Sequence, residues 1–175
     1  MKKYYLGIDP GKTAGAYVIL DEDRKVIEKG GLPMIGKKEY DKVGIKAIFT
    51  KFPYDHVGLE DPGTIFGSSK NAVASLHKGV GLMEGMLVGL GLPHTMCKPK
   101  EWQKQMWKDV TKQMTTSSSG KTQVVDTKAT SIMACVRLFP NENWKITGLG
   151  NPSKNYHDGM TDGALIAEYV RQMYK

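Results

Sequence analysis

Short hydrophobic runs separated by turn residues make up most of the first sixty positions of the chain. Residues 6–9, 16–20 and 25–30 form three such runs, and the segments between them are too short to hold a helix. This pattern predicts three strands joined as an antiparallel meander. A fourth strand is expected over residues 56–60 and a short fifth over residues 92–97.

Later segments repeat apolar residues every three or four positions, which is typical of amphipathic helices. Helices are therefore expected over residues 37–52, 70–90, 98–107, 122–138 and 157–174. Ser68 and Ser69 are both candidate caps for the second helix, whereas the Ser- and Thr-rich residues 115–120 are expected to form a flexible loop. This order of elements predicts a mixed α/β sheet flanked by helices, in a single domain spanning residues 1–175.

Three glycines fall on one face of the predicted helix over residues 70–90, at Gly81, Gly85 and Gly89. A glycine inside a helix costs about 1 kcal/mol relative to alanine, so another backbone is expected to approach this face closely. That backbone could belong to the sheet of the same chain or to the same helix of a second subunit. The glycine spacing alone leaves both alternatives open.

Composition indicates a globular protein, since 40% of the 175 residues are hydrophobic and 25% are charged. The formal net charge of +7 predicts a polyanionic partner, although a basic protein without such a partner is the simpler alternative. Only three of the 25 basic residues are arginine. Because lysine acts as a point charge, contact with phosphate is favoured over reading of base edges.

Lysines are concentrated between residues 98 and 128, where seven of them accompany three acids. Trp102 and Trp107 are interleaved with these lysines, a combination that fits a nucleic-acid surface. The alternative is a solvated helix face with Trp102 in the core. The loop predicted over residues 115–120 is expected to close over a bound strand.

Cysteine usage and hydropathy exclude other classes of protein. Cys97 and Cys135 stand in apolar surroundings without a CxxC pairing, so buried reduced thiols are expected rather than a zinc site or a disulfide. The apolar residues 80–92 are too few to span a bilayer, and they include Glu84. Neither this segment nor the first residues read as a membrane or signal segment, so a cytoplasmic protein is expected.

Carboxylates lie at the ends of two predicted strands and at the start of one predicted helix, three elements that are far apart in the sequence. Asp9 ends the first strand, Glu60 ends the fourth, and Asp158 and Asp162 share one face at the start of the last helix. Acids at a helix N-terminus also stabilise the helix dipole without any further role, and an acid after a strand is often simple turn chemistry. The N-terminal half of the last helix is apolar, however, so its two acids are expected to pack inward.

Inward-facing carboxylates repel one another unless a cation lies between them. Oxygen ligands without cysteine select magnesium or manganese, and four carboxylates suffice for two ions that together hydrolyse a phosphodiester. The neighbouring His157 is interpreted as a helix-cap residue in preference to a ligand or a proton shuttle. The residues thus predict a metal-dependent nuclease.

These segments resemble the motifs of the RuvC family of Holliday junction resolvases, within the RNase H and retroviral-integrase-like superfamily. Residues 7–11 (Gly-Ile-Asp-Pro-Gly) are similar to the first-strand motif, residues 59–60 to the second acid, and residues 157–165 to the C-terminal acidic helix. Residues 98–102 and 126–140 are similar to resolvases of phage type.

The resemblance implies an RNase H-like five-stranded mixed sheet, with three antiparallel strands followed by parallel ones. It implies a magnesium-dependent crossover junction endonuclease, with Mn²⁺ as a substitute ion, that leaves 5′-phosphate and 3′-hydroxyl ends. The implied catalytic residues and metal ligands are Asp9, Glu60, Asp158 and Asp162.

The same resemblance implies how the chain assembles and binds DNA. Its partners would be four-way and branched DNA and a second copy of the chain, packed through the helix that carries Gly81, Gly85 and Gly89. Lys104, Lys121 and Lys128 are the implied DNA-binding residues. A phage-encoded protein would act in the cytoplasm of its bacterial host.

The chain also departs from the family pattern. Asp158 and Asp162 are four residues apart rather than the usual three, and Asp61-Pro62-Gly63 stands where the family carries an aromatic wedge. These departures predict cleavage of branched DNA beyond four-way junctions. Alternative functions are an RNase H-like nuclease acting on RNA or RNA–DNA hybrid, and a DNA-binding protein without catalysis. An actin-like ATP-binding protein is a further alternative, but 175 residues leave no room for its second half.

Overall fold

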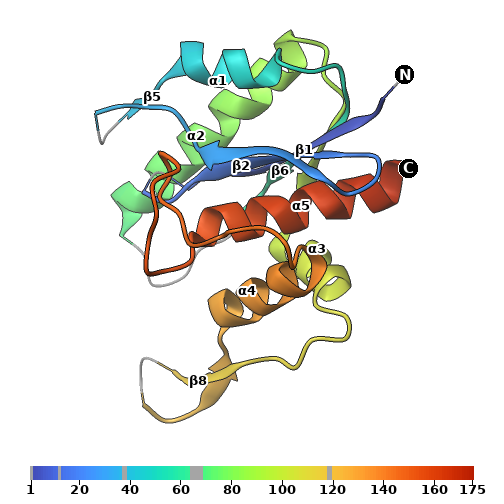
Figure 1. The fold of residues 1–175 in the computed structure, drawn as a ribbon. Coiled ribbons are helices and arrows are strands. Elements are labelled where there is room, and N and C mark those ends of the chain that lie inside the picture. Colours follow the sequence, from blue (N-terminus) through green and yellow to red (C-terminus); the bar gives the residue numbers. More distant parts are fainter. Residues whose placement is uncertain (1, 12, 37–38, 64–68, 118–119) are drawn as a thin grey trace.

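The computed structural model describes residues 2–11, 13–36, 39–63, 69–117 and 120–175 (Figure 1). Its central sheet has the strand order β3-β2-β1-β6-β7. These strands are β1 (Tyr4–Asp9), β2 (Ala16–Asp21), β3 (Val26–Gly31), β6 (Tyr54–Glu60) and β7 (His94–Cys97). The first three are antiparallel, whereas β6 runs parallel to β1 and β7 parallel to β6. The predicted five-stranded mixed sheet is therefore confirmed.

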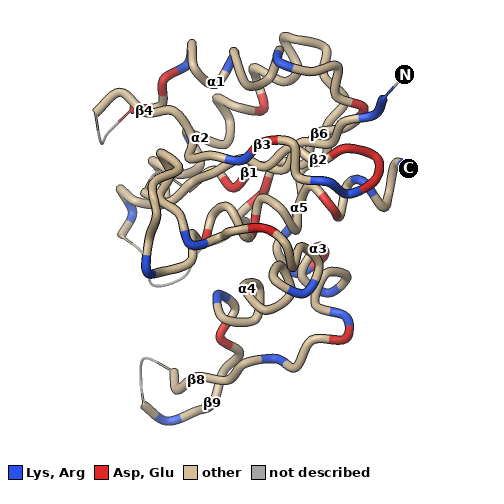
Figure 2. The backbone as a smooth tube through the Cα atoms, in the orientation of Figure 1, with Lys and Arg blue, Asp and Glu red and all other residues tan. Residues whose placement is uncertain are grey.

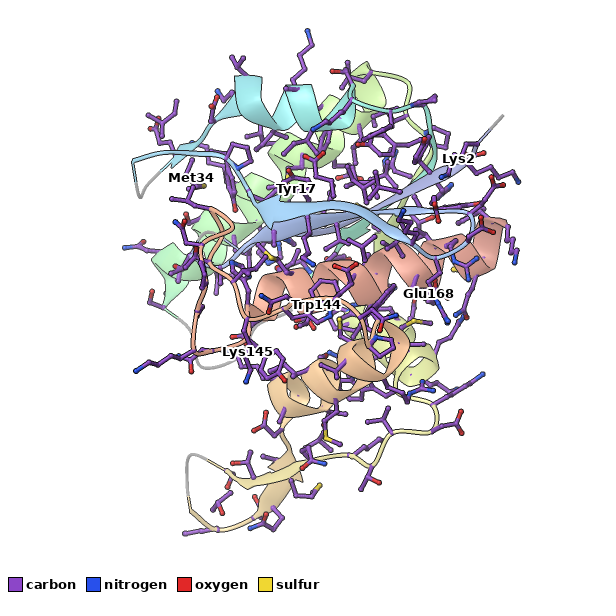
Figure 3. All side chains as sticks on the ribbon, viewed as in Figure 1. Lys2, Tyr17, Met34, Trp144, Lys145 and Glu168 are labelled. Atoms are coloured by element: carbon purple, nitrogen blue, oxygen red, sulfur yellow. The ribbon has the colours of Figure 1, made fainter. Side chains whose placement is uncertain are left out.

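Helices cover both faces of this sheet (Figure 1). One layer holds α1 (Lys42–Phe49) and α2 (Lys70–Gly89), and the other holds α3 (Pro99–Met106), α4 (Thr127–Leu138) and α5 (Asp158–Tyr174). Strand alternation explains the two layers, because Leu6 and Ile8 face α1 and α2 while Tyr5 faces α5. The loop before α5 adds Trp144, which is buried with its ring 5.8 Å from that of Phe139 (Figure 3).

Glycines in two central strands let α5 lie directly on the sheet. A Cβ atom at Gly7 would lie 2.0 Å from the Gly163 carbonyl oxygen, and one at Gly58 would lie 2.6 Å from Ile166 Cγ2. A larger residue at Gly7 would overlap the α5 backbone, and one at Gly58 would overlap side chains of α5. This close approach places the first turn of α5 beside the ends of β1 and β6.

The predicted helix over residues 37–52 is too long at both ends. Glu39–Tyr40 forms the short strand β5, which pairs with β4 (Met34–Ile35). Asp41 then starts α1, because its carboxylate accepts the amide hydrogens of Val43 and Gly44. Residues 37–38 lie outside the described part of the chain.

The region before α4 also differs from expectation. β8 (Met114–Thr116) and β9 (Gln123–Val125) form an antiparallel hairpin, so Thr115 and Thr116 belong to a strand rather than to a flexible loop. The predicted helix over residues 122–138 begins later, at Thr127, because Asp126 accepts from the Ala129 amide and caps it. Repeated Thr and Val side chains favour strands over helices here. Residues 118–119 lie outside the described residues.

Other local predictions are confirmed. Ser69 caps α2, whereas Ser68 is not among the described residues. Cys97 and Cys135 are free and buried. No described helix is long and apolar enough to cross a bilayer.

The glycine face of α2 does not pack on the sheet of its own chain. Nothing in the described structure lies within 4 Å of a Cβ atom built at Gly81, Gly85 or Gly89. The alternative in which the sheet approaches this face is therefore wrong.

Candidate metal centre

The carboxylates predicted from sequence gather at one end of the sheet. Asp9 and Glu60 end two neighbouring parallel strands, whose last aligned pair is Ile8 with Leu59. The first turn of α5 lies against them, since a Cβ atom at Gly159 would be 2.8 Å from Asp9 Oδ2 and 1.9 Å from the Ala14 carbonyl oxygen. Asp158 and Asp162 enter the same region from α5. The carboxyl ends of parallel strands are the usual ligand-binding edge of such sheets.

Burial and mutual repulsion raise the pKa values of three of these carboxyl groups. The pKa of Glu60 rises to about 8, by burial first and then by the charges of Asp9 and Asp162. Burial and the charge of Asp9 raise the pKa of Asp162 to about 7, although the Ser131 hydroxyl lowers it by hydrogen bonding. Asp9 reaches a pKa of about 6 through burial, opposed by the Gly11 amide. Each group therefore feels the charge of at least one other.

Asp158 differs from the other three, because its carboxylate is paired. Lys128, at the start of α4, forms an ion pair with Asp158 Oδ2, and the lysine side chain is 70% exposed. This contact raises the pKa of Lys128. The ammonium group neutralises one carboxylate at the cluster, so Lys128 belongs to this centre as well as to the predicted basic surface.

These carboxylates lie in one region but are not arranged as the ligands of a single metal ion. Among the described residues, no three His, Cys, Asp or Glu side chains are placed so that they could hold a metal together as they stand. The donors nevertheless fit a hard divalent cation, because all are carboxylate oxygens. Asp162 Oδ1 is buried and has no hydrogen-bond partner within the described part of the chain, which is the kind of oxygen that a cation would satisfy.

Trp102 is a functional neighbour for which the sequence left two interpretations open, a nucleic-acid surface and the core. Its side chain is fully buried, and its Nε1–H donates to Glu60 Oε1 at 3.2 Å. The core alternative is therefore correct for Trp102, and a nucleic-acid surface at this residue is wrong. Sequence carries no signal for this bond, because it joins α3 to the end of β6.

The remaining predicted residues lie apart from the carboxylates or support them. His157 caps α5 by accepting from the Met160 amide at 3.3 Å, which confirms the capping interpretation. Lys104, on α3, and Lys121, in the β8–β9 hairpin, are both exposed. Figure 2 shows basic positions along the segment from α3 to this hairpin.

Solved structures share this fold over nearly the whole chain. A structure of Thermus thermophilus RuvC in complex with a Holliday junction substrate matches with a TM-score of 0.61 and 12% identity, covering 98% of this chain and 96% of that one. The chain has the RuvC fold. A second Thermus thermophilus RuvC structure matches with a TM-score of 0.59 and 13% identity, covering 97% of this chain and 96% of the other.

The predicted RuvC-like, RNase H-like sheet is confirmed by this match. No protein-family model matches the sequence, and no curated protein does. The likeness is thus one of RuvC architecture at very low sequence identity. The function must explain why Asp9, Glu60 and the start of α5 lie together at one end of this RuvC-like sheet.

Proposed function

We propose that this protein is a magnesium-dependent endonuclease that resolves Holliday junctions and cleaves other branched DNA. One observation carries the proposal: carboxylates from β1, β6 and α5 converge at one end of a RuvC-like sheet and raise one another's pKa values. Such an arrangement destabilises the metal-free fold, so it is hard to explain unless cations bind. A RuvC neighbour was solved with a Holliday junction substrate, which supports branched DNA as the ligand.

Asp9, Glu60, Asp158 and Asp162 would hold Mg²⁺, with Mn²⁺ as a substitute. Two such ions supply an activated water and stabilise the leaving oxygen of a phosphodiester, leaving 5′-phosphate and 3′-hydroxyl ends. The chain orients its own donors: the Gly11 amide holds Asp9 Oδ1 at 3.0 Å, and Trp102 holds Glu60 Oε1. Lys128 would release Asp158 toward the metal and contact DNA phosphate instead.

A basic surface on and after α3 suits a DNA backbone. A hollow of about 290 Å³ on and after α3 carries four lysines and no acid; it is lined by Lys100, Gln103, Lys104, Trp107, Lys108 and Lys112. Lys121 extends the positive charge to the hairpin. Phosphate contacts of this kind bind DNA without reading its sequence.

The unpacked glycine face of α2 supports a homodimer, in which Gly81, Gly85 and Gly89 would meet the same helix of a second copy. Two copies would present two metal centres, as symmetric nicking of a four-way junction requires. A single domain over residues 1–175 and a phage-type resolvase acting in the bacterial cytoplasm complete the proposal.

The decisive experiment compares labelled four-way junction, flap, linear duplex and RNA–DNA hybrid, each with Mg²⁺ or EDTA. Branched DNA should be cut only with Mg²⁺, and Asp9→Asn should bind the junction without cutting it. Cleavage confined to the hybrid would favour the RNase H-like alternative. Junction binding without any cutting, under all metal conditions, would favour a DNA-binding protein without catalysis.

Replacing Trp102 with phenylalanine tests how Glu60 is held. The variant keeps a buried aromatic ring but removes the Nε1–H that donates to Glu60. Loss of a group that orients a metal ligand typically costs about 10- to 100-fold in activity, so cleavage should slow by that factor. Trp144→Phe is a matched control, since the Trp144 indole is also buried and its Nε1 has no partner among the described residues. Equal rates for the two variants would contradict this role of Trp102.

A further inference from the structure

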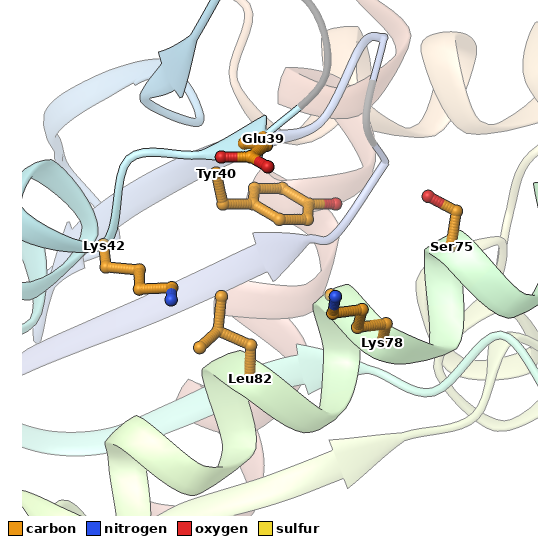
Figure 4. Close-up of a pocket in the computed structure, with 7 residues that line it drawn as sticks. Glu39, Tyr40, Lys42, Ser75, Lys78 and Leu82 are labelled. Atoms are coloured by element: carbon orange, nitrogen blue, oxygen red, sulfur yellow. The ribbon is translucent and has the colours of Figure 1, made fainter.

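Tyr40 lies between α2 and the turn that follows Asp9. Its side chain is only 7% exposed, and its hydroxyl donates a hydrogen bond to the Pro10 carbonyl oxygen. Figure 4 shows the hydroxyl end of the ring pointing toward the turn after β1. This turn carries the peptide group next to the candidate metal ligand Asp9.

A glycine of α2 makes room for the ring. A Cβ atom at Gly79 would lie 2.5 Å from Tyr40 Cε2 and 2.8 Å from its hydroxyl oxygen. Tyr40 therefore rests directly on the α2 backbone. Because β5 also pairs with β4, the ring is held from a paired strand on one side and a helix on the other.

The carbonyl that Tyr40 binds and the amide that binds Asp9 belong to one peptide group. Tyr40 contacts the oxygen of the Pro10–Gly11 peptide, and the N–H of the same peptide donates to Asp9 Oδ1 at 3.0 Å. A trans peptide is planar, with its oxygen and hydrogen on opposite sides, so fixing one atom orients the other. Donation to the carbonyl also polarises the N–H and strengthens its own hydrogen bond.

We propose that Tyr40 is a positioning residue of the metal centre. It orients the Pro10–Gly11 peptide so that the Gly11 amide holds Asp9 Oδ1 and leaves Oδ2 facing the start of α5, where Gly159 lies close to it. The inference rests on the proposed function only in treating Asp9 as a metal ligand. Nothing in the sequence pattern connects Tyr40 with Asp9, 31 positions away.

The surroundings of Tyr40 leave part of its ring open and keep its hydroxyl a donor. A hollow of about 260 Å³ borders the ring, lined by Glu39, Tyr40, Lys42, Ser75, Lys78, Gly79 and Leu82, so the ring is not enclosed on every side (Figure 4). Burial and then the charge of Asp9 raise the pKa of Tyr40 to about 12. The hydroxyl therefore stays protonated and remains a donor at any working pH.

The test compares Tyr40→Phe with Tyr54→Phe. Tyr54 is a matched control because its buried hydroxyl also donates to a backbone carbonyl, that of Ile48 at 2.7 Å, away from the carboxylates. In metal-free protein, hydrogen exchange of the Gly11 amide, measured by NMR, should be roughly fivefold faster in Tyr40→Phe, as expected for loss of one hydrogen bond. Binding of Mg²⁺, measured by calorimetry, should weaken by about tenfold.

Tyr54→Phe should lower the melting temperature to a similar extent and leave both readouts unchanged. Gly79→Ala, which displaces the ring but keeps the hydroxyl, should reproduce both effects of Tyr40→Phe. Wild-type Gly11 exchange in Tyr40→Phe would overturn the inference, even if the variant were less stable. The exchange measurement needs neither metal nor DNA, so it tests the role of Tyr40 independently of cleavage. Failure of the wild-type protein to cut branched DNA would count against the proposed function alone.

Discussion

Alanine in place of Gly7 is expected to lower the free energy of unfolding by at least about 3 kcal/mol, the upper part of the range for overpacked cores. The new Cβ atom would lie 2.0 Å from the Gly163 carbonyl oxygen and 2.3 Å from the Ala167 amide nitrogen. Both atoms belong to the α5 backbone, so no side-chain rotation relieves the overlap. The helix must move away from β1, and it carries Asp158 and Asp162 with it. Urea denaturation followed by circular dichroism measures the loss.

Gly163→Ala is the control from the opposite side of the same contact. A Cβ atom at Gly163 would meet its nearest neighbour, the Gly7 carbonyl oxygen, at 3.4 Å, which is ordinary van der Waals contact. Replacing a helix-interior glycine with alanine favours the helix by about 1 kcal/mol, so this variant should be neutral or more stable. If Gly7→Ala were as stable as Gly163→Ala, the close packing of α5 on β1 would be wrong.

Asp162→Asn is expected to abolish cleavage and at the same time to stabilise the metal-free protein. The substitution removes a charged metal ligand. Loss of a residue that only orients a ligand typically costs up to roughly 100-fold in activity, so loss of the ligand itself should lower the cleavage rate by well above that factor. It also removes a buried carboxylate that burial and the charge of Asp9 already disfavour. The metal-free variant should be more stable by about 2 kcal/mol at pH 8. This is less than the full pKa shift implies, because relaxation around the buried carboxylate lowers the cost of its charge.

The pH dependence of this gain has a definite sign. The folded-state pKa of Asp162, about 7, lies above the unfolded value, so its contribution to stability is complete at low pH and is lost as pH rises through 7. The asparagine variant cannot ionise and escapes that loss. The difference in unfolding free energy, measured in EDTA, should therefore be small below about pH 4, grow between about pH 4 and pH 7, and level off above that.

Asp23→Asn, which changes an exposed carboxylate in the β2–β3 turn, provides the comparison for a loss of charge alone. Because this carboxylate is exposed and lies outside the metal centre, its replacement should not reproduce the gain in stability expected for Asp162→Asn. Added Mg²⁺ should raise the melting temperature of the wild-type protein and of Asp23→Asn, but much less that of Asp162→Asn. A pH-independent difference for Asp162→Asn would mean that neither burial nor the charge of Asp9 disfavours ionisation of Asp162.

Local patterns were sufficient for most of the sheet and for the candidate ligands. Alternating apolar residues place Leu6 and Ile8 on one face of β1, and a Pro-Gly pair must end that strand at Asp9. Capping is equally local, as Ser69 and His157 illustrate. Predictions failed where two local tendencies compete. Asp41 and Asp126 start helices inside segments whose periodicity suggested earlier starts. The hairpin before α4 pairs one strand from a segment that composition presents as a loop with another from the segment predicted as a helix.

The amino-acid sequence by itself determined which side chains could serve a metal centre, because strand ends and helix starts follow from short-range patterns of apolar, turn and capping residues. Only the tertiary structure decided what holds those side chains. Lys128 on Asp158, Trp102 on Glu60 and Tyr40 on the Pro10 carbonyl each join elements distant in the chain. Such contacts depend on how the elements pack across the sheet. That packing requires close approach of the α5 backbone at Gly7 and of the Tyr40 ring at Gly79, which no periodic signal predicts.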